Sequence, residues 1–240
     1  MTLVNESVTL PNKYCATMST LNPWKQRFYP QEGDGAPFDR VLFFSDAVFA
    51  IALTLMAVEI GIPEIDGDLA SDPGALWDGI YAKGPNLTAY LVAFIWVAIY
   101  WRANHKFSVT LARMNGAYII GVLVYLGLIA LLPLPAGMLG EYVTNPLAVS
   151  LFAAYAATVS FMEVVLFVLA DRGKLFRVPL NDRQRNGQII GSLTPVVAFG
   201  ISIPLAFRLG TGWAIGFWFV GSFALGMIML RVFPQDVPES

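Results

Sequence analysis

RVLFFSDAVFAIALTLMAV is the sequence of residues 40–58, in which Arg40 and Asp46 are the ionisable side chains. Residues 47–58 carry no charge, and the apolar side chains follow one another without the alternation of a barrel strand. A continuous apolar run of this kind is typical of a helix that crosses a lipid bilayer. We therefore expect a first membrane-spanning helix at residues 41–62.

Further apolar runs repeat this pattern along the chain. Each is close to the roughly 20 residues that a spanning helix needs, and they lie at residues 85–103, 117–138, 147–170, 189–207 and 211–232. The composition agrees: of 240 residues, 56% are hydrophobic and 13% are charged, about half the charge of a typical soluble protein. The sequence predicts an all-α membrane protein with six transmembrane helices per subunit.

The basic residues predict how these helices are oriented. Of the 15 Lys and Arg residues, all but Lys83 and Arg208 fall before the first span, between spans two and three, between spans four and five, or at the end of span six. Basic residues collect on the cytoplasmic side of membrane proteins. We expect both termini in the cytoplasm, with a flexible cytosolic lead at 1–36, a six-helix channel domain at 37–233 and a cytosolic tail at 234–240.

Several classes of function conflict with the composition. The net charge of −2 leaves no basic excess for nucleic acid. One cysteine and one histidine provide no disulfide, no metal-ligand cluster and no nucleophile with a neighbouring base. We expect no enzyme activity, no cofactor and no nucleic-acid partner, and we expect membrane lipid around the chain.

The loop after the first span is acidic. Its carboxylates would concentrate cations at the outer face, or they serve only to keep an exposed loop soluble. Both readings remain open from the sequence. The residues are Glu64, Asp66, Asp68, Asp72 and Asp78.

Three ionisable residues lie within or at the ends of the spans: Asp46, His105 and Glu163. Such groups are costly at membrane depth, and they mark a pathway or an internal partner. All three are predicted in the cytoplasmic third of the bundle. Trp101 and His105 are four residues apart and share a helix face. We favour a structural network that joins Asp46 and Ser45 to this face, and we identify no partner for Glu163.

The first span also carries a stripe of branched apolar residues. Ile51, Leu55 and Val58 recur at the spacing of one helix face, and Thr54 lies beside them. Periodicity alone leaves packed core, lipid contact and the wall of a pore as readings of this stripe.

The polar start of the first span resembles a known family. Arg40, Phe44, Ser45 and Asp46 spell the motif RxxxFSD of the prokaryotic branch of the lysosomal potassium channel family (transmembrane protein 175 family). The likeness continues over residues 96–142 and covers about 38–145. It rests there on Trp101, on NHKF at 104–107, on Asn115, on LPLP at 132–135 and on GEY at 140–142.

This resemblance implies a potassium-selective channel in a prokaryotic plasma membrane, with the potassium ion as permeant species. Four six-helix subunits would surround a pore that the first helix lines, since animal members carry two repeats and this chain carries one motif. Carried over by position, the constriction would be formed by Ile51, with Leu55 and Val58 next along the pore and Thr54 beside them. Arg40, Ser45 and Asp46 would hold the first helix against the region of Trp101 and His105.

Other classes of function remain as alternatives. Pro133 and Pro135 in span three, with Pro195 and Pro204 in span five, would suit the broken helices of a secondary transporter or small exporter. No internal repeat of the transporter kind is found. A non-conducting scaffold also remains open. Since no TVGYG-type segment lies between spans, a channel of this sequence would need a hydrophobic constriction instead of a carbonyl filter.

Overall fold

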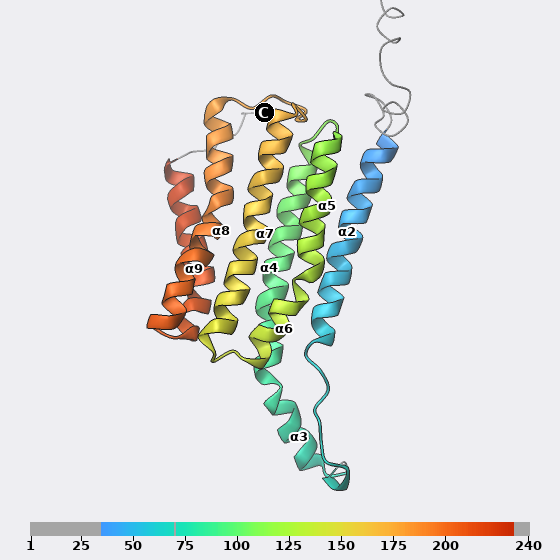
Figure 1. Cartoon of the computed structure of the whole chain (residues 1–240), viewed down its shortest axis with the longest axis vertical. Helices are drawn as coiled ribbons and strands as arrows, with labels where there is room; N and C mark the ends of the chain where they lie inside the picture. Colours follow the sequence, from blue (N-terminus) through green and yellow to red (C-terminus); the bar gives the residue numbers. More distant parts are fainter. Residues whose placement is uncertain (1–34, 70, 233–240) are drawn as a thin grey trace, which may run out of the picture.

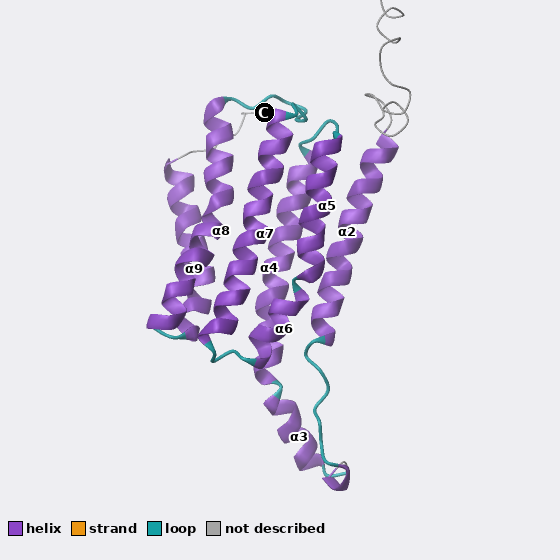
Figure 2. Ribbon diagram, in the orientation of Figure 1, coloured by secondary structure: helices purple, strands orange, loops and turns teal. Residues whose placement is uncertain are grey.

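The computed structural model describes residues 35–69 and 71–232. In this part of the chain, six segments are long and apolar enough to cross a membrane. They lie side by side as a helical bundle (Figure 1). Apart from an isolated bridge between Leu111 and Phe176, the described residues form no paired strands (Figure 2). The predicted all-α class and the six spans are confirmed. The predicted lead and tail lie mostly outside the described residues.

The spans are formed by seven helices. These are α2 (Gly35–Val58), α4 (Gly84–Val109), α5 (Gly116–Leu131), α6 (Pro133–Glu141), α7 (Pro146–Arg172), α8 (Asp182–Arg208) and α9 (Thr211–Val232). Helices α5 and α6 together make the third span, Gly116–Glu141.

The first helix differs from its predicted bounds at both ends. It begins at Gly35 instead of residue 41, and it ends at Val58 instead of residue 62. At Gly61 the backbone has a φ of 69°, a left-handed value that glycine adopts without strain. Pro63 follows and cannot donate a helical hydrogen bond, so the chain leaves the helix here.

The prolines in spans three and five have different effects. Span three breaks at Leu132, whose N–H bonds back only to Ile129 at 3.2 Å, and α6 starts with Pro133 at its first position, where a missing N–H costs nothing. Helix α8 instead runs unbroken through Pro195 and Pro204. Span five therefore lacks the broken helix that would favour the alternative of a secondary transporter.

The helices pack as two connected groups. Helix α2 packs against α4, α5 and α6, while α7 contacts α5, α6, α8 and α9, so α8 and α9 form the edge remote from α2 (Figure 1). The core between these groups is aromatic: the ring centroid of Phe199 lies 4.7 Å from Trp96 and 5.6 Å from Trp218. This core fixes the helices that hold the polar residues described below.

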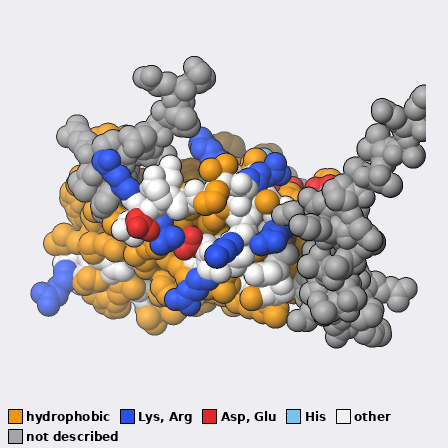
Figure 3. All heavy atoms as spheres, turned by 90° about the horizontal axis from the view of Figure 1, so that it is seen from above, with side chains coloured by type: hydrophobic (Ala, Val, Ile, Leu, Met, Phe, Trp, Pro, Cys, Tyr) orange, Lys and Arg blue, Asp and Glu red, His pale blue; other side chains and the backbone are white. Residues whose placement is uncertain are grey.

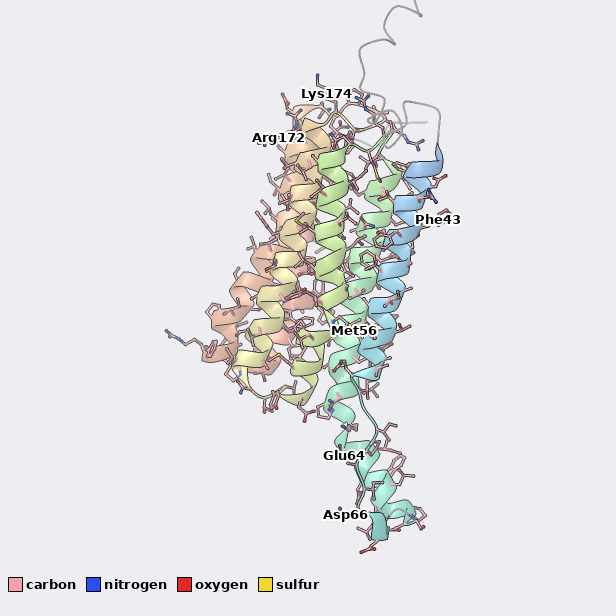
Figure 4. All side chains as sticks on the ribbon, turned by 45° about the vertical axis from the view of Figure 1, so that its right-hand side comes forward. Phe43, Met56, Glu64, Asp66, Arg172 and Lys174 are labelled. Carbon is pink, nitrogen blue, oxygen red and sulfur yellow. The ribbon has the colours of Figure 1, made fainter. Side chains whose placement is uncertain are left out.

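The two ends of the bundle carry opposite charge. Lys and Arg side chains gather on the end that carries the loops after α4 and α7 (Figure 3), and Arg172 and Lys174 mark it in Figure 4. At the other end a hairpin with Glu64 and Asp66 projects from the bundle (Figure 4). It contains η1 (Gly67–Leu69) and α3 (Pro73–Ala82).

One acidic residue in this hairpin, Asp72, has local structural partners. Asp72 caps α3 by accepting hydrogen bonds from the backbone N–H of Gly74 and Ala75 at 3.1 and 3.3 Å. The segment predicted as an acidic loop is thus partly helical, and one of its carboxylates satisfies a helix end.

Candidate functional site

Helix α2 has one face buried in the bundle and one exposed face. Ser45, Phe49, Ala52 and Met56 are at most 3% exposed and recur at helical spacing. Figure 4 shows Met56 on the side of α2 toward the bundle and Phe43 on the outward side. We call the four buried residues the anchor face.

The opposite face of α2 carries the stripe predicted from the sequence. The exposed fractions are 58% for Ile51, 47% for Leu55 and 74% for Val58. Thr54 is also exposed, and its hydroxyl donates to the carbonyl oxygen of Ile51 at 2.8 Å. We call Ile51, Thr54, Leu55 and Val58 the open face. Of the three readings of this stripe, packing in the core of one subunit is therefore wrong.

Polar contacts from α4 hold the inner half of α2. The indole Nε1 of Trp101 donates to Oδ1 of Asp46 at 2.8 Å. One turn further along α4, the amide Nδ2 of Asn104 donates to Oγ of Ser45 at 2.9 Å. These two bonds fix the rotation of α2, because Ser45 and Asp46 are neighbours that point to different sides of the helix.

The imidazole of His105 supports Trp101 from the same helix. Their ring centroids are 5.5 Å apart with planes inclined by 25°, a stacked arrangement. Since α4 continues to Val109, His105 lies inside the helix and not at its end. Arg40 and Phe44 are exposed, and the structure gives Arg40 no hydrogen bond or ion pair with another described residue.

Glu163 does not join this network. It accepts a hydrogen bond from the hydroxyl of Tyr125 on α5 at 3.0 Å, whereas Asp46 pairs with Trp101. The contact of Asn104 with Ser45 was not predicted from the sequence. Its spacing of three residues from Trp101 was the available signal, since it places both side chains near one face of α4.

Among the described residues, no group of three or more His, Cys, Asp and Glu side chains is arranged to hold a metal ion. The network around α2 consists instead of one carboxylate, hydroxyl and amide groups, and aromatic rings. Such a set orients a helix through hydrogen bonds and provides no nucleophile with an adjacent base.

Comparison with known proteins adds sequence relatives for the region that contains this network. Residues 40–133 match the family described as endosomal/lysosomal potassium channel TMEM175. A potassium channel of Streptomyces collinus is 36% identical over 128 residues, which are 53% of this chain and 60% of that protein. Potassium channels of a Chryseobacterium species and of Chamaesiphon minutus are 32% and 29% identical, over 45% and 52% of this chain and 53% and 61% of theirs. The matched region thus spans little more than half the length of these relatives.

A solved structure has the same fold. The crystal structure of a lysosomal potassium-selective channel TMEM175 homolog from Chamaesiphon minutus superposes with a TM-score of 0.65. The match covers 81% of this chain and 98% of that one at 21% identity. Together with the six apolar helices, this identifies a multi-pass membrane protein. Residues 40–133 of the chain thus resemble the TMEM175 family in sequence, and the described bundle has the fold of the solved TMEM175 homolog.

Proposed function

We propose that the protein is a potassium-selective cation channel whose pore is lined by the open face of α2 in a homotetramer. The observation that carries this proposal is the two-sided character of α2. One side is fixed to α4 by hydrogen bonds from Trp101 and Asn104, and the other side presents exposed branched apolar residues. Lipid would cover such a face equally well, and the likeness to potassium channels supports the pore over lipid contact.

In this arrangement Ile51 from each subunit forms the narrowest ring. A ring of branched apolar side chains excludes water when it is narrow and blocks ions by dewetting. A small rotation of α2 would admit water again. The polar contacts to Ser45 and Asp46 oppose such a rotation, which assigns them the role of holding α2 in register.

Selectivity in this design comes from dehydration at the ring. Potassium loses its hydration shell at a lower free-energy cost than sodium, so a constriction that strips water favours potassium. The hydroxyl of Thr54 adds an oxygen next to the ring, because its proton is already donated to the carbonyl of Ile51. We expect a moderate preference for potassium.

The proposed orientation places the basic end of the bundle in the cytoplasm. This follows from the excess of Lys and Arg at the loops after α4 and α7, which Figure 3 shows together on one end. Both termini would then be cytoplasmic, in a prokaryotic plasma membrane. The hairpin with α3 would stand on the outer side, where its carboxylates attract cations.

Ion flux from liposomes that contain the purified protein tests the channel. We expect potassium flux to exceed sodium flux, with valinomycin as positive control. Ile51→Asn should increase flux and reduce the ratio of potassium flux to sodium flux, because a ring of asparagine side chains keeps water in the constriction. Ile201→Asn is the matched control, since Ile201 is 44% exposed on α8, a helix remote from α2; it should leave flux unchanged.

The outcomes separate the alternatives. Equal flux in Ile51→Asn and the unchanged protein would refute the constriction. No flux in either protein would favour a secondary transporter that awaits its substrate, although α8 is not broken at its prolines. Native mass spectrometry in mild detergent tests the assembly, and a mass other than that of four chains would refute the homotetramer.

A further inference from the structure

Glu163 is an acidic residue inside the bundle that forms no ion pair with a basic side chain of the described residues. It lies in the interior of α7 (Pro146–Arg172), and its Oε1 accepts the hydroxyl proton of Tyr125. Across residues 35–69 and 71–232, the ion pairs that form all involve Arg185, with Asp171 and Asp182, and none reaches Glu163. A carboxylate at membrane depth needs a counter-charge or a proton to offset its desolvation.

A cavity opens directly at this carboxylate. It has a volume of about 50 Å³ and lies between α4, α5, α7 and α8. One water needs about 10–15 Å³ of such volume, so the cavity has room for a few waters or for one partly hydrated cation. Phe107 and Phe167 form part of its apolar wall.

The polar groups that line the cavity offer oxygen atoms. Asn104, Tyr125, Glu163, Gln188 and Ser192 contribute a carboxylate, two amides and two hydroxyls from four helices. Two of these groups already donate a hydrogen bond: the Tyr125 hydroxyl donates to Glu163 and the Asn104 amide nitrogen donates to Ser45. Within the described part of the chain, no side chain donates to the Asn104 amide oxygen.

We propose that this cavity binds one alkali-metal cation, with Glu163 as the charged ligand and with Asn104 and Ser192 as neutral oxygen ligands. Hard cations prefer carboxylate, carbonyl and hydroxyl oxygens. A single carboxylate balances one positive charge, and the described residues that line the cavity include no second carboxylate, histidine or cysteine, which favours a monovalent over a divalent ion. None of the ligands lies on α2, so the site does not depend on α2 lining a pore.

Cation binding would also support the position of α2. A cation that holds the amide oxygen of Asn104 directs its NH₂ group toward Ser45, which is the orientation that the structure shows at 2.9 Å. The site is therefore linked to the anchor face through one amide side chain.

The test replaces potassium with thallium(I) in crystals of the full chain and measures anomalous scattering. We expect a thallium peak in each subunit between Glu163, Asn104 and Ser192, and we expect it to be lost in Glu163→Gln. Glu141→Gln is the matched control, because Glu141 lies on α6 and is exposed; this variant should keep the peak. A well-ordered cavity without a thallium peak in the unchanged protein would overturn the proposal and would mean that a proton neutralises Glu163.

A second variant and a solution measurement guard against misfolding of Glu163→Gln. Ser192→Ala keeps the charge and removes one oxygen, so the thallium concentration that half-saturates the site should rise several-fold. In solution, potassium should raise the melting temperature relative to N-methylglucamine at equal ionic strength, and Glu163→Gln should abolish this shift. Unchanged thallium binding in both variants would contradict the assignment. A thallium peak in the cavity of a protein that shows no ion flux would support this cation site and contradict the proposed channel.

Discussion

The hydrogen bond between Ser45 and Asn104 gives the sharpest prediction for the stability of the α2 anchor. Ser45 is 3% exposed and Asn104 is 9% exposed, and their side chains are joined at 2.9 Å. Ser45→Ala removes the acceptor and leaves a buried amide N–H without a partner. A buried group of this kind costs about 1–3 kcal/mol.

In a membrane protein the expected loss of stability lies in the lower part of this range. Hydrogen bonds between helices of a membrane protein contribute about 0.6 kcal/mol on average and up to about 1.7 kcal/mol. Because this pair is buried, we expect Ser45→Ala to lower the free energy of unfolding by about 1–2 kcal/mol. Asn104→Leu removes the orphaned amide, so the double variant should recover part of the loss, with a coupling energy of about 1 kcal/mol.

Reversible unfolding of the purified protein in mixed detergent micelles measures these differences. Ser150→Ala is the matched control: Ser150 is 7% exposed on α7, and its hydroxyl has no hydrogen-bond partner among the described residues. This variant should be neutral or slightly stabilising. A loss below about 0.5 kcal/mol in Ser45→Ala, or an equal loss in Ser150→Ala, would mean that the unpaired amide of Asn104 does not destabilise the protein.

Two further predictions concern helix packing and the outer hairpin. A Cβ at Gly140 would lie 3.0 Å from the backbone Cα of Asn86, whereas one at Gly127 would meet nothing within 4 Å. Gly140→Ala should therefore lower the free energy of unfolding by about 1–3 kcal/mol, whereas Gly127→Ala should raise it by about 0.5–1 kcal/mol. The same unfolding assay measures both, and changes of the same sign in the two variants would contradict the close packing at Gly140. Asp72→Ala removes the cap of α3, which costs about 1 kcal/mol, so the first amides of α3 should exchange hydrogen about fivefold faster. Asp78→Ala is the matched control, because Asp78 is an acidic residue inside α3 that does not cap it. This variant should leave the exchange rate unchanged, and equal acceleration in both variants would refute a capping role of Asp72.

The helical class and the number of spans could be predicted because both follow from local composition. A run such as residues 47–58 has no charge, and in lipid its backbone must satisfy its own hydrogen bonds. The ends were less predictable. The chain leaves α2 through a left-handed Gly61, and α8 continues through two prolines because tertiary packing outweighs the local cost of each proline.

For the candidate site, the sequence indicated the residue types and the structure decided their partners. Motif and spacing pointed to Ser45, Asp46 and Trp101, but the role of Asn104 and the pairing of Glu163 with Tyr125 required coordinates. These contacts join residues that are 38 to 59 positions apart in the chain, and periodicity carries no information across such distances.

Six helical membrane spans with one basic and one acidic end could be predicted without coordinates, since hydropathy and charge act residue by residue. Which face of α2 is fixed and which is open required the packed bundle. That choice depends on side chains of α4, α5 and α6 that approach α2 from distant parts of the chain. The same packing leaves a cavity beside Glu163, because four helices meet there around polar side chains that do not fill the space between them.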